Sequence, residues 1–319
     1  MYCGGNELFN NWSKMTDQSL ALRLLNKLCY ELDRERPFIM TSPVFGMGHG
    51  GYTFYDPDKD CDVFTLFQNS NCTAYTEFGV PGLTNVQTLR SIIPEEELWP
   101  PKPGGSWELH HAFNAWGVER WLCRDVLERY APAPIETLDD MVNLSNWLQC
   151  EGYKAVFEEC RRQKPFCSMA VNWFFDEPWI TVGNNNLITY PAKPRPAYYA
   201  VQSALRPVLA SARIPKFDWK ASERFTAELW LLNDSPEAAG RVVTASIIID
   251  GRIYPMFTWD SGEVPANENR IGPSINWILP DADVDSFVLR LTAEDGASSE
   301  YRLLYRKKGH RAISRQLNV

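Results

Sequence analysis

The chain has 319 residues, 45% of them hydrophobic and 23% charged, so it is long enough for two folded domains that each bury a core. Its formal net charge of −8 argues against a nucleic-acid or membrane partner, because both reward clustered Lys and Arg. Eight cysteines without a CxxC pair indicate reduced, mostly buried thiols, and no apolar run is long enough to span a bilayer. From these limits we expect a cytoplasmic globular protein.

The first residues predict a short strand that ends on a carboxylate. Met1-Tyr2-Cys3 is apolar, Gly4-Gly5 permits a tight turn, and Asn6-Glu7 follow at the strand end. Residues 19–33 predict an amphipathic helix, since leucines recur at helical spacing behind the capping residues Thr16-Asp17-Gln18.

A second carboxylate at a strand end follows further along the chain. Residues 37–43 predict a short buried strand, a glycine-rich loop surrounds His49, and residues 61–67 predict another strand. The run Asn71–Gly79 then alternates as a strand does and stops at Gly79, which places Glu77 where a strand meets a loop.

The next part of the chain changes from loops to a long helix. Residues 81–134 are rich in proline and aromatic residues, as is typical of long loops that carry function or cover a core. Residues 137–163 predict a helix that Thr137 caps. Residues 166–175 then read as a continuous apolar strand of the kind found in parallel sheets, with Asp176-Glu177 at its C-terminal end.

From about residue 207 the helical spacing disappears. Short alternating runs separated by Asn, Asp, Gly and Pro predict an antiparallel β-sandwich with an immunoglobulin-like topology. The expected fold class is therefore α/β plus all-β, with a first domain over 1–207 and a sandwich domain over 208–319.

The two strand-end glutamates suggest hydrolytic chemistry. A (β/α)₈ barrel places its catalytic residues at the C-terminal ends of its strands. Retaining glycoside hydrolysis needs two carboxyl groups about 5–5.5 Å apart, one as nucleophile and one as general acid/base. Taken alone, such a pair is better explained as solvated or salt-bridged acids.

Three motifs carry a resemblance to a known family. YCGGNE resembles the acid/base motif of glycoside hydrolase family 2, and YTEFG resembles its nucleophile motif. The segment MAVNWFFDEPWITVGNNNLITYPAKPRPAYYAVQSALRPVL resembles the strand-8 block of the β-mannosidase-like branch. The resemblance covers roughly residues 1–209 and implies strands 4–8 of a partial (β/α)₈ TIM barrel followed by the trailing β-sandwich.

The resemblance also implies roles for single residues. Glu7 would be the acid/base, Glu77 the nucleophile, Asn6 the partner of the sugar's 2-hydroxyl and Trp173 the floor beneath the sugar ring. Burial beside the Glu77 charge would keep Glu7 protonated.

Other residues are open to more than one interpretation. His49 could touch the sugar or make a local hydrogen bond, and the adjacent His110 and His111 point to different sides, which argues against a metal site. Asp176 and Glu177 could line the entrance, but a turn cap or surface pair is the better interpretation. Trp99, Trp107 and Trp116 could each serve as a platform for a sugar ring or pack in a core or loop.

The prediction is thus a retaining exo-β-glycosidase acting on terminal β-mannosides or related β-galactosides or β-glucosaminides, without cofactor or metal. The alternative is a non-catalytic carbohydrate-binding or assembly module on a glycosidase remnant. An esterase is disfavoured because no G-x-S-x-G elbow is present. Since strands 1–3 of a barrel would be missing, we expect an incomplete enzyme with little activity alone, and either a homo-oligomer or an absent N-terminal half.

Overall fold

A computed structural model describes residues 1–115 and 121–308. The chain divides into two compact units. The first comprises Met1–Gly51, Asn71–Phe78 and Pro165–Trp173, and the second comprises Tyr52–Ser70, Gly79–Lys164 and the chain from Phe174 onward.

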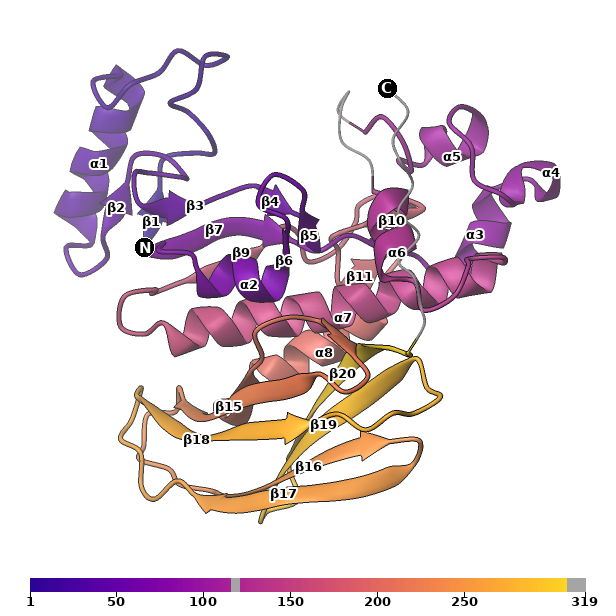
Figure 1. Ribbon diagram of the computed structural model, residues 1–319. Coiled ribbons are helices and arrows are strands. Elements are labelled where there is room, and N and C mark those ends of the chain that lie inside the picture. The colour runs from indigo at the N-terminus through magenta and orange to yellow at the C-terminus, as the bar shows by residue number, and fades with distance from the viewer. Residues whose placement is uncertain (116–120, 309–319) are drawn as a thin grey trace. The chain divides into compact units, whose positions relative to one another are not determined.

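The first unit contains one helix and several short strands (Figure 1). Its elements are β1 (Tyr2–Cys3), α1 (Leu20–Leu32), β2 (Phe38–Ile39), β3 (Met47–Gly48), the start of β4 (Gly51–Tyr52), most of β7 (Ala74–Gly79) and β9 (Ala170–Asn172). β1 pairs with β2, and β7 pairs with β3 and with β9, all in parallel. Parallel pairing aligns the carboxyl ends of these strands, where Glu7 and Glu77 are predicted to lie.

Helix α1 forms where the sequence predicts it, but its leucine-rich side does not become a core. Only Leu22 of this helix is buried. Leu20, Leu24 and Leu28 are 72%, 51% and 50% exposed. The amphipathic pattern therefore predicts the helix correctly and its burial wrongly.

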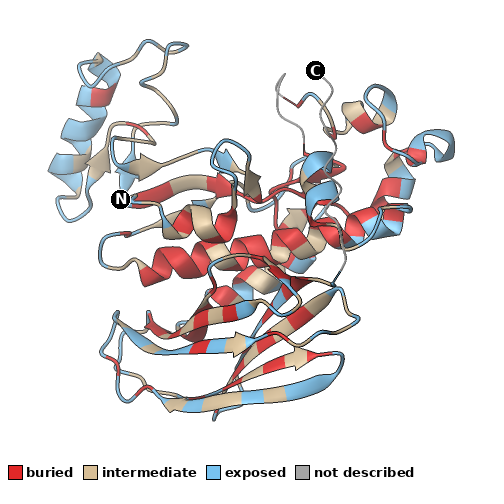
Figure 2. Ribbon diagram, in the orientation of Figure 1, coloured by how far each residue is buried: buried red, intermediate tan, exposed pale blue. Residues whose placement is uncertain are grey.

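The second unit holds most of the helices (Figure 1). Its helices and short strands are β5 (Tyr55–Asp56), β6 (Cys61–Asp62), α2 (Val63–Gln68), β8 (Gly82–Leu83), α3 (Val86–Ile92), α4 (Glu95–Leu98), α5 (Gly105–Leu109), α6 (Arg124–Tyr130), α7 (Leu138–Arg162), β10 (Gly183–Asn184), β11 (Ile188–Thr189), β12 (Lys193–Pro194) and α8 (Pro196–Ala204). Helix α7 is buried along most of its length, as Figure 2 shows. Its capping box between Thr137 and Asp140 confirms the predicted start.

Two predicted strands are wrong. Most of residues 61–67 form α2, because the buried Asp62 carboxylate accepts the backbone N–H groups of Phe64 and Thr65 and so caps a helix. The predicted continuous strand over 166–175 shrinks to β9, and Phe166 and Val171 are 48% and 46% exposed. Apolar runs alone do not separate a buried strand from a helix or an exposed segment.

A two-sheet sandwich follows from residue 208 onward, and its predicted immunoglobulin-like topology stays a prediction. Its strands are β13 (Val208–Arg213), β14 (Asp218–Lys220), β15 (Arg224–Asn233), β16 (Val242–Ile249), β17 (Arg252–Asp260), β18 (Asn269–Ile278), β19 (Ser286–Ala293) and β20 (Ser298–Arg306). One sheet has the order β13-β15-β18 and the other β14-β20-β19-β16-β17. Side chains of β19 alternate between buried and half-buried, which explains the period-2 sequence pattern.

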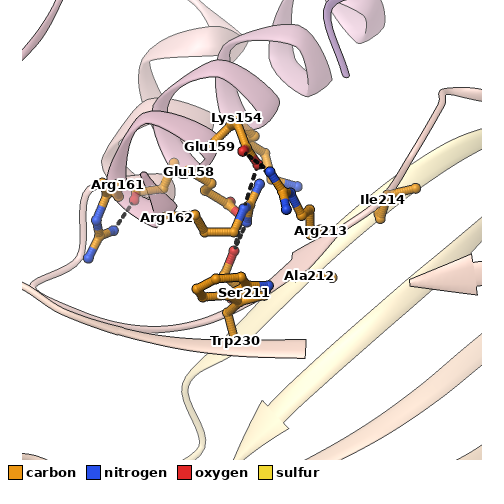
Figure 3. A network of polar contacts seen from close by, with 12 residues as sticks. Lys154, Glu158, Glu159, Arg161, Arg162, Ser211, Ala212, Arg213, Ile214 and Trp230 are labelled. Carbon is orange, nitrogen blue, oxygen red and sulfur yellow. Dashed lines mark hydrogen bonds and ion pairs between the residues drawn. The ribbon is translucent and has the colours of Figure 1, made fainter. Parts of the chain in front are cut away.

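Buried charges join α7 to the sandwich (Figure 3). The Glu158 carboxylate accepts hydrogen bonds from Ser211 Oγ at 2.5 Å and from Tyr301 Oη at 2.7 Å. Glu159 accepts from Arg162 Nε at 2.8 Å and forms a second ion pair with Arg213. The helix and the sandwich therefore belong to one unit, while the predicted domain boundary at residue 207 stays a prediction.

The fold is mixed helix and sheet, as expected, but the predicted partial barrel is not confirmed. The strands of the first unit are two to six residues long. They fall into two sheets, one formed by β1-β2 and one built around β7. The predicted burial of the cysteines is also largely wrong, since only Cys160 and Cys167 are buried.

No helix in the described part of the chain is long and apolar enough to cross a membrane.

Candidate active site

Glu7, four residues beyond the end of β1, is held in place by backbone contacts. Its N–H donates to the Ser42 carbonyl at 2.7 Å, and the Ser42 N–H donates to the Gly5 carbonyl at 3.0 Å. Gly4 makes this approach possible, since a Cβ there would lie 2.4 Å from the Met40 carbonyl oxygen. Glu7 itself has a φ of 52°, a left-handed conformation that is uncommon for residues other than glycine.

Glu77 lies within β7, two residues before its end. Strands β3 and β9 both pair in parallel with β7, and the Trp173 N–H donates to the Phe78 carbonyl at 2.8 Å. The Gly50 N–H donates to the Glu77 carbonyl at 3.0 Å. The glycine-rich loop is thereby fixed beside the strand that carries the carboxylate.

His49 joins the two carboxylates. Its Nε2 lies 2.9 Å from Glu7 Oε1 and 2.9 Å from Glu77 Oε2. One donor atom of each of the three residues lies within 4.8 Å of the other two. The geometry therefore brings together the two glutamates and the loop histidine that the sequence singled out, from three separate segments of the chain.

The three side chains differ in exposure. The side chain of Glu7 is 39% exposed, that of Glu77 15% and that of His49 9%. The expected burial of Glu7 is therefore not observed.

Sequence reasoning missed two further contacts of the cluster. Asn10 Nδ2 donates to Glu7 Oε2 at 3.2 Å. Thr76 Oγ1 lies 3.1 Å from His49 Nδ1. Asn10 follows Glu7 by three residues and Thr76 precedes Glu77, so both were within reach of a search for polar neighbours of the motifs.

Asn6 and Trp173 lie next to this cluster along the chain. Asn6 is exposed and forms an isolated parallel bridge with Ser42. Trp173 is half-buried directly after β9. Their roles toward a sugar stay predictions.

The remaining candidates are placed elsewhere. The His110 ring stacks on Trp179 with centroids 4.8 Å apart and its Nδ1 lies 2.9 Å from the Ile180 carbonyl oxygen. Burial and the neighbouring His110 lower the pKa of His111. Among the described residues, the only group with metal-ligand spacing is Glu7, His49 and Glu77, so the adjacent histidines belong to no such group.

The tryptophans and the acidic turn separate into buried and exposed residues. Trp107 is buried and its Nε1 donates to the Glu97 carbonyl at 2.8 Å, whereas Trp99 is 36% exposed. Trp116 lies outside the described residues. Glu177 is not a surface residue: it is 4% exposed, it accepts from Thr181 Oγ1 at 2.7 Å, and burial raises its pKa.

Comparison with known proteins supports the motif-based resemblance. No protein-family model matches the chain. β-Mannosidase B from Aspergillus niger is 25% identical over 222 residues, which are 66% of this chain and 25% of the relative. β-Mannosidase B from Aspergillus clavatus is 26% identical over 75% of this chain and 32% of the relative. The chain thus spans about a quarter to a third of the length of these relatives.

Solved structures show the same fold at low identity. A β-D-mannosidase from Dictyoglomus thermophilum superimposes with a TM-score of 0.69 and 22% identity over 95% of this chain and 38% of that protein. The chain resembles the C-terminal portion of a β-mannosidase-like enzyme of glycoside hydrolase family 2. An exo-chitosanase from Amycolatopsis orientalis superimposes with a TM-score of 0.64 and 16% identity over 85% of this chain and 33% of that protein. These likenesses support the resemblance and a hydrolase, and they leave the substrate open.

Proposed function

We propose that this chain carries the carboxylate pair of a retaining exo-β-glycosidase that acts on β-mannosides or closely related β-glycosides. The observation that carries the proposal is the Glu7–His49–Glu77 cluster. In it, a carboxylate oxygen of Glu7 lies within 4.8 Å of a carboxylate oxygen of Glu77. Inverting enzymes hold their carboxyl groups about 6.5–9.5 Å apart, and retaining enzymes about 5–5.5 Å apart. The short separation leaves no room for a water between the carboxylates and favours the retaining reaction.

The two glutamates differ in a way that fits two roles. Glu7, the more exposed residue, would donate a proton to the leaving oxygen and later accept one from water. Glu77, set within β7 and less exposed, would attack the anomeric carbon and form the glycosyl ester. His49 would hold both carboxylates at this separation while the sugar occupies the open side of Glu7.

The parallel pairs formed by β1, β2, β3, β7 and β9 support the further proposal that the first unit is part of a (β/α)₈ barrel. Acids at the carboxyl ends of parallel strands are the arrangement that this fold uses for catalysis. The substrate class comes from the β-mannosidases among the relatives, and a carbohydrate is accordingly the proposed partner.

Covalent trapping tests the proposal. A 2-deoxy-2-fluoro-β-mannoside with a dinitrophenyl leaving group should label the chain once, on the peptide that contains Glu77, as read by mass spectrometry. Glu77→Gln should abolish the label and the exposed control Glu96→Gln should retain it. Saturable binding of the mannoside with no label on the wild-type chain would contradict the proposal and favour a non-catalytic binding module.

A further inference from the structure

The space between Glu7, His49 and Glu77 has the properties of a cation site. His49 Nε2 faces a carboxylate oxygen on each side at 2.9 Å. Because two carboxylates repel each other and a neutral imidazole nitrogen adds a third lone pair, the three atoms are stable together only with a proton or a metal ion among them.

The outer partner of His49 fixes which ring nitrogen faces this space. Thr76 Oγ1 donates to the Gly48 carbonyl at 3.4 Å, so its lone pairs are available to the His49 Nδ1–H at 3.1 Å. With Nδ1 protonated, the Nε2 lone pair points to the glutamates unless a proton occupies it. A hydroxyl or carbonyl that orients the far nitrogen is the arrangement that metal-binding histidines use.

The donor set selects the class of ion. One imidazole nitrogen and two carboxylate oxygens, with a position left for water, match a zinc-type site with three protein ligands. Mg²⁺ and Ca²⁺ prefer sites made entirely of oxygen. The zinc bonds of about 2.0–2.2 Å would separate tetrahedral ligand atoms by roughly 3.3–3.6 Å, so each 2.9 Å contact has to open by a few tenths of an ångström. The partly exposed Glu7 side chain has the freedom to do so.

We propose that Glu7, His49 and Glu77 bind one Zn²⁺-class transition-metal ion, which displaces the shared proton and occupies the carboxylates. Metal binding and proton binding compete for His49 Nε2, because the ion needs the unprotonated nitrogen as a ligand. The consequence for activity rests on the proposed function: an occupied site holds both glutamates as ligands, and the enzyme is reversibly inhibited.

The test measures binding without substrate. The chain of 319 residues, freed of metal with a chelator, is titrated with Zn²⁺ by calorimetry and with Co²⁺ by visible absorption, whose intense bands report tetrahedral ligation. We expect one ion per chain with these bands. His49→Ala and Glu7→Gln should each weaken binding at least tenfold, and Thr76→Val should weaken it by about 10-fold or more through the loss of the outer partner.

Matched control variants distinguish binding at this site from binding to other His and Glu side chains of the chain. His111→Ala and Glu96→Gln remove the same side-chain types at distant positions of the chain and should leave binding unchanged. Circular dichroism checks that each variant is folded. If His49→Ala does not fold, Glu7→Gln tests the metal site instead, because it keeps the size of a partly exposed side chain. Equal affinities of wild type, His49→Ala and Glu7→Gln would overturn the proposal.

The fluoroglycoside label distinguishes the two proposals. Zn²⁺ binding without any labelling of the metal-free chain would contradict the glycosidase and leave the metal site standing. Labelling without Zn²⁺ binding would contradict the metal site alone. If both are correct, Zn²⁺ protects Glu77 from the label and a chelator restores labelling.

Discussion

His49 occupies the position from which one side chain controls two acids. Its 2.9 Å contacts to Glu7 and Glu77 hold the carboxylates in one arrangement, and the Thr76 contact orients the ring. The Gly50 N–H fixes the loop to the Glu77 carbonyl. A sugar that approaches Glu7 meets a carboxylate whose position is already set, which is how an active site lowers the entropic cost of reaction. Gly48 serves this histidine by letting the loop lie close to β7.

Replacing the acid should affect poor leaving groups most. In a complete enzyme with Glu7→Ala, aryl β-mannosides with good leaving groups should react much faster than those with poor ones, because only the latter need protonation. Added azide should raise the rate and yield a glycosyl azide. Steady-state rates against leaving-group pKa measure both effects, and an equal loss for every leaving group would show that Glu7 is not the acid.

Gly48 should not tolerate a side chain. A Cβ there would lie 2.6 and 2.8 Å from two ring atoms of the buried Tyr75. Gly48→Ala should therefore lower the free energy of unfolding by about 1–3 kcal/mol through overpacking. Gly51, whose Cβ would meet no atom within 4 Å, gives the control Gly51→Ala. Urea denaturation of both variants compares them, and equal stabilities would contradict the crowding seen here.

Helix α7 is the element that ties the second unit together. Its capping box starts it, its apolar positions fill the core, and its last turns present Glu158 and Glu159 to β13 and β20. Buried charges are costly unless paired, so this contact is specific as well as stable. The pairing fixes how the helix and the sandwich fit together within the unit.

The pH dependence of stability should report this contact. Burial raises the pKa of Glu159, but Arg162 and Arg213 outweigh it and hold the pKa below its ordinary value. A depressed pKa in the folded state contributes stability above the unfolded pKa of about 4.3 and loses it as the pH falls through the folded value. Glu159→Gln should therefore cost about 3–5 kcal/mol at neutral pH, and the cost should shrink in acid.

Thermal melts of wild type and Glu159→Gln between neutral and acidic pH measure this difference. The exposed Glu263→Gln serves as the control and should follow the wild type at every pH. A cost of Glu159→Gln that stays constant down to acidic pH would contradict the ion pairs.

At the scale of the whole molecule, an exposed leucine face on α1 stands out. Leu20, Leu24, Leu28 and Leu32 lie at helical spacing and are all at least half exposed. Contiguous apolar surface of this kind favours contact with other protein surfaces. The matched stretches cover only 25% and 32% of two β-mannosidase relatives.

Polar substitution of this face should reduce self-association. Leu24→Glu with Leu28→Glu should give a smaller mean mass by light scattering at high protein concentration, because apolar surface is removed without loss of buried contacts. Helix formation should persist, as Glu has good helix propensity. An unchanged mass distribution would show that α1 does not drive association.

Sequence alone determined the elements whose signals are local. The capping pair and apolar period of residues 138–162 identify α7, and strict alternation identifies β19, because each pattern follows from the repeat of one element. The motifs likewise pointed to Glu7, His49 and Glu77. Only the tertiary structure decided that His49 lies between the two glutamates, that the Glu7 side chain is 39% exposed, and that Asp62 begins a helix where the apolar run predicts a strand. Burial, distance and the choice between helix and strand depend on residues that are far apart in the chain, and no local pattern contains them.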